Sequence, residues 1–278
     1  MKETDLALAQ ISAQLGKPEE NTIKILSFME EARGKNADLL VFPECSLTGY
    51  APDKAADLAV FSDAAASACA ARIRQRAAVL GIAVCFGYME KSGEKYYISQ
   101  ELCVPSGKSE CDVTVYRKTH LGSKESVFLS AGNDFPTPKV RVSVGEILTG
   151  MQLCWESHIP QISSVYRACG AELLLFPYAS GMSGEKCREN WSVHLPARAS
   201  DNGCFAAACN LILPGDEGGS PKGGGLAVWD PKGKLICGCW DTEVKLMLCR
   251  IGGRLPRDKH PEDMHNISYF DRVRKELF

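Results

Sequence analysis

The chain has 278 residues, of which 45% are hydrophobic and 24% are charged, and its formal net charge is -2. These values are ordinary for a globular protein, and a chain of this length buries a substantial core without metal or disulfide support. The near-neutral charge balance gives no electrostatic reason to expect nucleic acid or an anionic membrane surface as a partner.

The sequence also gives no sign of a membrane or secreted protein. No stretch approaches the roughly 18 consecutive apolar residues of a membrane-spanning helix. The segment Met1–Asp5 carries two acids with no long apolar run behind it, which argues against a signal peptide. Most of the 13 cysteines lie in apolar runs and form no Cys-x-x-Cys pair, so we interpret them as small buried hydrophobes rather than zinc ligands. We therefore expect a cytoplasmic, reducing location.

The first half of the chain alternates short apolar runs with helical patterns. Asn21 to Gly34 predicts a helix, with apolar residues at three- and four-residue spacing, and a second helix is expected over 64–80. The strands expected in this half are Leu6–Ile11, Ala37–Phe42, Ile82–Gly87 and a hairpin of Tyr96–Val104 with Glu110–Tyr116.

The second half repeats this plan. Ile162 to Cys169 predicts a helix that ends at Gly170, and Asp216–Gly225 is rich in glycine and predicts a loop. The strands expected here are Glu146–Leu153, Ala171–Phe176, Cys204–Asn210, Leu226–Trp229 and Glu243–Cys249.

The run Ala171–Pro177 matches Ala37–Pro43 almost residue for residue, and both runs follow an amphipathic helix. We infer two similar half-units within one domain over residues 1–278, the alternative being a coincidence between two buried strands. The polar tail 254–278 is expected to wrap the surface or a partner subunit.

Strands that alternate with helices predict an α/β protein, in which ligands gather at the carboxyl ends of the strands. The residues just beyond those ends are Glu44, Cys154 and Tyr178. A thiol between a strand and a helix can project into a cleft, where the helix N-terminus favours its thiolate. A carboxylate such as Glu44, at the end of an apolar strand, must be solvated, paired or functional.

Two further candidates follow the strand that ends near Tyr116. Lys118 lies where this strand gives way to a loop, and Glu125 lies seven residues beyond it. Taken singly, each candidate also has an ordinary interpretation: Cys154 as a buried core thiol, Glu44 and Glu125 as surface acids, and Lys118 as a solvated amine.

Taken together, three segments form a highly specific sequence pattern. They are Phe42–Tyr50 (FPECSLTGY), Tyr116–Leu121 (YRKTHL) and Gly150–Glu156 (GMQLCWE). They resemble the three catalytic segments of the nitrilase superfamily, in the right order and spacing. Ala197–Phe205 and Asp230–Gly233 are similar to later segments of that family, so the resemblance covers nearly the whole chain.

The resemblance implies a four-layer αββα sandwich of two mixed sheets flanked by helices. It implies Glu44 as general base, Lys118 as oxyanion-stabilising cation, Cys154 as nucleophile and Glu125 as an additional substrate-positioning acid. The residues that it implies for substrate binding are Tyr50, Trp155, Tyr178 and Trp191, with the Trp155 backbone N–H completing the oxyanion hole.

The chemistry suits these residue types, because an amide carbonyl is a poor electrophile and needs both a strong nucleophile and a stabilised oxyanion. We expect hydrolysis of a small aliphatic amide or N-carbamoyl compound through a thioacyl enzyme, with release of ammonia. This hydrolysis needs no metal or organic cofactor. Homo-oligomers are common in the family, and the Cys154–Cys169 region with the tail is the expected contact.

Three alternatives remain open. The Cys154–Glu156 motif resembles nitrile-cleaving members, which makes a nitrilase the second hypothesis. A papain-like hydrolase would pair Cys154 with a histidine, namely His120, His158 or His194. A non-catalytic binding protein is the third.

The chain departs from the family pattern at two positions. Leu226 stands where a serine is usual, and Asp201 replaces the usual glutamate. The stretch from Lys118 to Glu125 is also short, which could alter one wall of the substrate pocket.

Overall fold

The computed structural model describes residues 1–55, 65–107, 109–143, 145–215 and 220–253. The described helices are α1 (Pro18–Gly34), α3 (Ala65–Leu80), α4 (Pro160–Ala168) and α5 (Gly184–Asn202), with short 3-10 turns η1 (Pro52–Lys54), η2 (Glu125–Val127) and η3 (Cys154–His158). None of these helices combines the length and apolarity needed to cross a membrane.

The strands form two six-stranded sheets and one small two-stranded sheet. The first sheet has the order β14 (Lys245–Ile251), β1 (Thr4–Gln10), β2 (Leu39–Val41), β3 (Ala83–Ser92), β4 (Lys95–Pro105), β5 (Cys111–Arg117). The second has the order β13 (Leu235–Cys239), β12 (Leu226–Trp229), β9 (Phe205–Asn210), β8 (Leu173–Tyr178), β7 (Gly145–Met151), β6 (Lys139–Val142). The small sheet pairs β10 (Ile212–Leu213) with β11 (Lys222–Gly223).

Both large sheets repeat one pattern of strand directions. In the first, β1, β2 and β3 are parallel neighbours, and β4 and β5 follow antiparallel. In the second, β7, β8 and β9 are parallel neighbours, and β12 and β13 follow antiparallel. An extra antiparallel strand then extends each sheet, β14 beside β1 and β6 beside β7. The matching sequence runs occupy matching places in this pattern, in β2 and β8.

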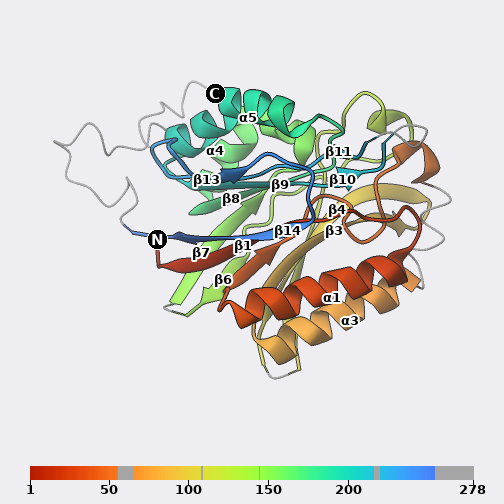
Figure 1. The fold of residues 1–278 in the computed structure, drawn as a ribbon, viewed down its shortest axis with the longest axis horizontal. Helices are drawn as coiled ribbons and strands as arrows, with labels where there is room; N and C mark the ends of the chain where they lie inside the picture. Colours follow the sequence, from red (N-terminus) through yellow and green to blue (C-terminus); the bar gives the residue numbers. More distant parts are fainter. Residues whose placement is uncertain (56–64, 108, 144, 216–219, 254–278) are drawn as a thin grey trace.

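The molecule has four layers (Figure 1). Helices α1 and α3 cover the outer face of the first sheet, and α4 and α5 cover the outer face of the second. Three apolar clusters fill the spaces between layers: one lies between the sheets, one lies under α1 and α3, and one lies under α4 and α5. Strands β2 and β8 are buried along their whole length, because both of their faces are covered. The predicted αββα sandwich is therefore confirmed.

Several predicted elements need correction. Helix α5 was not predicted, and neither were β6 and β13; β3 runs on to Ser92 and pairs with β4 as a long hairpin. Strand β11 lies inside the segment Asp216–Gly225 that was predicted to be a loop, because Ile212 and Leu213 provide a partner strand for it. The predicted start of the second helix at residue 64 and the tail 254–278 lie outside the described residues.

Candidate active site

Glu44 follows the buried strand β2 and is itself fully buried. The next residue, Cys45, has a φ of 55°, a left-handed conformation that is uncommon for a residue with a side chain. The turn packs tightly against Gly87 on β3, where an added Cβ would lie 2.6 Å from the backbone nitrogen of Cys45. The local backbone therefore fixes the direction in which the Glu44 carboxylate leaves the strand.

Lys118 follows β5 and is also buried, with 1% of its surface exposed. Its backbone N–H donates to the carbonyl of Ile98 at 2.9 Å, and its carbonyl accepts from the N–H of Gly132 at 2.8 Å. Its ammonium group donates to Glu44 Oε1 at 2.9 Å and to Glu125 Oε1 at 2.8 Å. One buried cation thus joins two buried carboxylates from segments that are far apart in the sequence.

Glu125, in η2, is held from several directions. Its Oε1 also accepts from the Tyr50 hydroxyl at 3.0 Å, and its Oε2 accepts from the backbone N–H of Gly122 at 2.7 Å. The short loop between Lys118 and Glu125 therefore folds back on itself. As a result, the Glu125 carboxylate lies on the same ammonium group as the Glu44 carboxylate.

Cys154 opens η3, after β7, and is partly buried. Its φ is 48°, so it too adopts the left-handed conformation, a strain of about 1–3 kcal/mol that the surrounding fold has to hold in place. Burial, together with the charge of Glu44, raises the pKa of the thiol to about 12, while the charge of Lys118 and a hydrogen bond from the Ala179 backbone oppose this shift. The resting thiol is therefore protonated at neutral pH and requires a base.

The electrostatics make Glu44 suited to that task. Burial is the main cause that raises its pKa from 4.5 to about 7, partly opposed by the charge of Lys118. Burial alone would lower the pKa of Lys118, but the charges of Glu44 and Glu125 outweigh it and raise that pKa well above the usual value. One oxygen of Glu44, Oε2, has no hydrogen-bond partner among the described residues, so it is available to accept a proton.

Glu156 is a further residue of the site that sequence reasoning did not single out. It is fully buried in η3, two residues after Cys154. Its Oε2 accepts from the Leu153 backbone N–H at 2.7 Å. Its Oε1 accepts four hydrogen bonds, from the Tyr116 hydroxyl (2.7 Å), the Thr119 N–H (2.8 Å), the Thr119 hydroxyl (2.8 Å) and the His120 N–H (3.0 Å). One carboxylate therefore ties the loop of Lys118 to the turn of Cys154. The only sequence signal was an acid two residues after the motif cysteine.

The four aromatic residues implied for substrate binding differ in their placement. Tyr50 reaches Glu125 directly. Tyr178 is 2% exposed at the end of β8, and burial raises the pKa of its hydroxyl well above the usual value. Trp155 is 51% exposed and its ring lies against His158. Trp191 is fully buried in the cluster under α5, with its ring centroid 4.7 Å from that of Tyr178.

The histidines that a papain-like mechanism would need are engaged with other residues. His194 Nε2 lies 2.9 Å from the Ser157 hydroxyl, and its ring packs on His158 with centroids 4.2 Å apart. Burial, with the neighbouring His158 and Arg198, lowers the pKa of His194 to about 4. His120 Nδ1 lies 2.8 Å from the Thr119 hydroxyl. Within the described part of the chain, no histidine hydrogen-bonds to Cys154.

The two departures from the family pattern lie away from these charged groups. Leu226 is buried in the core between the sheets, and Asp201 lies exposed near the end of α5. The described residues contain no group of three or more His, Cys, Asp or Glu side chains arranged to hold a metal ion.

Comparison with known proteins identifies the family of this chain. A family model described as carbon-nitrogen hydrolase matches residues 5–251. An (R)-stereoselective amidase of Pseudomonas sp. is 28% identical over 86% of this chain and 82% of its own. A 2-oxoglutaramate amidase of Bacillus subtilis is 26% identical over 98% of both chains.

Solved structures show the same relationship at the level of the fold. A cysteine-to-alanine mutant of the amidase from Nesterenkonia sp. AN1, in complex with butyramide, has a TM-score of 0.79 and 25% identity, with 99% of this chain and 95% of that chain covered. The chain therefore belongs to the carbon-nitrogen hydrolase family, within the nitrilase superfamily, and is a carbon-nitrogen hydrolase.

Proposed function

We propose that this protein is an amidase that hydrolyses a small amide or N-carbamoyl compound and releases ammonia, with Cys154 as nucleophile, Glu44 as general base and Lys118 as oxyanion-stabilising cation. The observation that carries the proposal is the buried Lys118 ammonium, held between Glu44 and Glu125 beside the Cys154 thiol. The butyramide bound to the similar Nesterenkonia amidase supports a small aliphatic amide as the substrate class.

The reaction follows from the protonation states of the resting site. Glu44 takes the proton of the Cys154 thiol as the sulfur attacks the amide carbonyl carbon. The carbonyl oxygen becomes an oxyanion, which Lys118 and the Trp155 backbone N–H stabilise. As the C–N bond breaks, Glu44 gives its proton to the departing ammonia, and an acyl thioester remains on Cys154. A water molecule, deprotonated by Glu44, attacks this thioester and releases the acid and the thiol.

Glu125 positions the cation rather than transferring the proton in this scheme. Its contact with Lys118 keeps the ammonium charged and oriented, and its contact with Tyr50 connects the charged groups to an aromatic wall. Removing one oxyanion donor from such a site lowers the rate by about a hundred- to a thousand-fold.

The experiment is ammonia release from a panel of amides, ureido acids and nitriles, combined with intact-protein mass spectrometry. We expect ammonia from aliphatic amides, an acyl adduct on Cys154, and no turnover or adduct for Cys154→Ala. Cys169→Ala, which removes an exposed thiol of the same region, is the matched control and should react normally. Ammonia from nitriles alone would identify a nitrilase, and the absence of turnover with every compound would support a non-catalytic protein.

The cellular setting is part of the proposal. All 13 cysteines are free thiols in the structure, which suits a reducing compartment such as the cytoplasm. We propose a homodimer or higher homo-oligomer whose contact includes the Cys154–Cys169 region, where Trp155 and Val165 expose 51% and 39% of their surfaces.

A further inference from the structure

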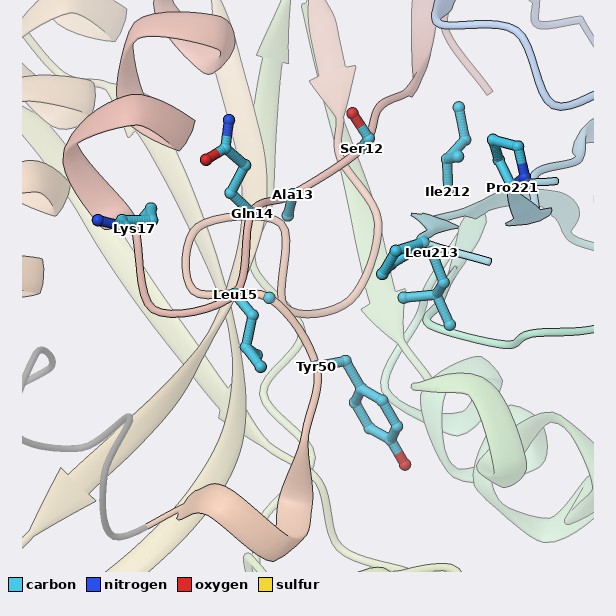
Figure 2. A pocket seen from close by; sticks show the side chains of 11 residues that line it. Ser12, Ala13, Gln14, Leu15, Lys17, Tyr50, Ile212, Leu213 and Pro221 are labelled. Carbon is cyan, nitrogen blue, oxygen red and sulfur yellow. The ribbon is translucent and has the colours of Figure 1, made fainter. Parts of the chain in front are cut away.

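A cavity of about 470 Å³ opens at the edge of the sandwich, with Tyr50 among the residues that line it (Figure 2). One wall is the segment after β1, including Leu15, and the opposite wall is formed by β10 and the residues around it. Tyr50 lies at one end of the cavity, between these walls. Its apolar lining consists mainly of Leu15, Tyr50, Ile212, Leu213, Pro214 and Pro221.

One residue connects this cavity to the reacting groups. Tyr50 lines the cavity while its hydroxyl donates to Glu125, the carboxylate that holds Lys118. A chain that leaves the charged groups along the Tyr50 ring is therefore directed toward the cavity.

The charges around the cavity restrict what it can bind. Among the described residues that line it, Lys17 is the one charged residue, and it is exposed. Its amine points away from the cavity in Figure 2. A carboxylate on the bound group would find no buried cation among the described lining residues, whereas an aliphatic chain would bury its surface against leucine, isoleucine and proline side chains.

We propose that this cavity is the acyl-chain subsite, and that the enzyme prefers amides of uncharged aliphatic acids of about four to six carbons. The inference rests on the proposed amidase function. The amide carbonyl lies at Cys154, and the chain runs past the Tyr50 ring into the cavity. The volume falls within the range of small-molecule pockets, about 300–1,000 Å³. Each additional methylene group of the substrate chain that enters the cavity should raise kcat/KM by about threefold to fourfold.

The test measures kcat/KM for unbranched amides from acetamide to hexanamide, with glutaramic acid as the charged comparison. We expect wild-type kcat/KM to rise with chain length through at least pentanamide, and glutaramic acid to react at least tenfold more slowly than pentanamide. Leu213→Ser should lower the pentanamide-to-acetamide ratio several-fold. Leu15→Ser changes the opposite wall at a side chain that is 42% exposed, so it tests the same ratio in a variant that folds readily.

Leu235→Ser is the matched control, because Leu235 is 43% exposed on β13 and does not line the cavity. It should retain the wild-type ratio. Acetamide turnover with a flat chain-length profile, or an unchanged ratio in both wall variants, would overturn the subsite and leave the amidase function standing. Preference for glutaramic acid would also overturn it. No ammonia from any amide would remove the proposed function and the subsite together.

Discussion

Glu44 shows how a single carboxylate acquires its chemistry from its surroundings. Its position after an apolar strand is visible in the sequence, but its pKa of about 7 is a consequence of burial that only the fold provides. One of its oxygens is held by Lys118 and the other is free to accept a proton. At neutral pH the group is therefore poised between its two protonation states, as a general base and acid requires.

The pH dependence of kcat/KM follows from that pKa. Only the carboxylate form of Glu44 can accept the thiol proton, and the carboxylate fraction grows as pH rises through about 7. We therefore expect kcat/KM for an amide to increase from pH 5 to pH 8, with its midpoint near pH 7. Steady-state rates across this range check the prediction. A flat profile, or a midpoint near pH 4, would contradict it.

Glu156 is a second carboxylate whose role depends on its contacts. Replacing it by glutamine leaves the shape but removes the charge from an oxygen that accepts four hydrogen bonds, each worth about 1.5–3 kcal/mol when the acceptor is ionised. Glu156→Gln should lower kcat by about ten- to a hundred-fold, because Lys118 and Cys154 lose their common anchor. KM should change much less.

The matched control for this change is Glu146→Gln, at an exposed acid of β7, which should keep the wild-type kcat. Comparing the thermal unfolding of both variants separates lost positioning from lost folding. A Glu156→Gln enzyme that folds normally and keeps the wild-type kcat would show that the anchor is not needed.

At the scale of elements, the site is built from strand ends that are each held by a close backbone contact. The turn after β2 packs on Gly87, and the end of β5 packs on Gly132. A Cβ on Gly132 would lie 2.3 Å from the carbonyl oxygen of Arg117, a backbone atom that cannot move aside without moving Lys118. Gly132 therefore permits the approach that places the ammonium group.

Gly132→Ala tests this arrangement. The added methyl group should push the loop away from β5, shift Lys118 from Glu44 and lower kcat by about tenfold or more. Gly34→Ala at the end of α1, where a Cβ meets nothing within 4 Å, is the matched control and should leave kcat unchanged. Kinetics and circular dichroism of both variants provide the measurement. Equal kcat values in the two variants would show that Gly132 is not needed to place Lys118.

At the scale of the whole molecule, the Cys154–Cys169 region, which contains α4, is with the tail 254–278 the proposed contact between subunits. Val165 on α4 and Val193 on α5 expose 39% and 80% of their surfaces, and both helices lie on one outer face of the sandwich in Figure 1. An apolar side chain exposed on α4 suits such a contact.

Val165→Arg should therefore convert the proposed homo-oligomer into smaller species, because it places a charge in an apolar contact. Light scattering after size exclusion measures the mass. Val79→Arg is the matched control, since Val79 is 57% exposed on α3, on the opposite outer face, and this variant should keep the wild-type mass. A wild-type protein that is monomeric at micromolar concentration would contradict the proposed contact.

Local patterns were sufficient for the parts of the fold that depend on neighbouring residues. Apolar runs indicated β2 and β8, and helical spacing with a terminal glycine indicated α1 and α4. They were insufficient for α5, which contains Pro196 and buries the polar residues His194 and Arg198 on the same side as Trp191. Because polar and apolar residues share its buried face, the pattern of an amphipathic helix is lost.

The sequence by itself determined the α/β class and most of the strands, and it predicted Glu44, Lys118 and Cys154 as the catalytic residues, because these inferences follow from short-range spacing and recognisable motifs. Only the tertiary structure decided how the groups act on one another. Glu44 and Lys118 are 74 residues apart in the chain, yet their side chains meet at 2.9 Å inside the protein. Burial and charge where distant segments come together set the pKa values. The anchoring by Glu156 and the shape of the cavity beside Tyr50 also depend on contacts between distant segments, and no local pattern encodes them.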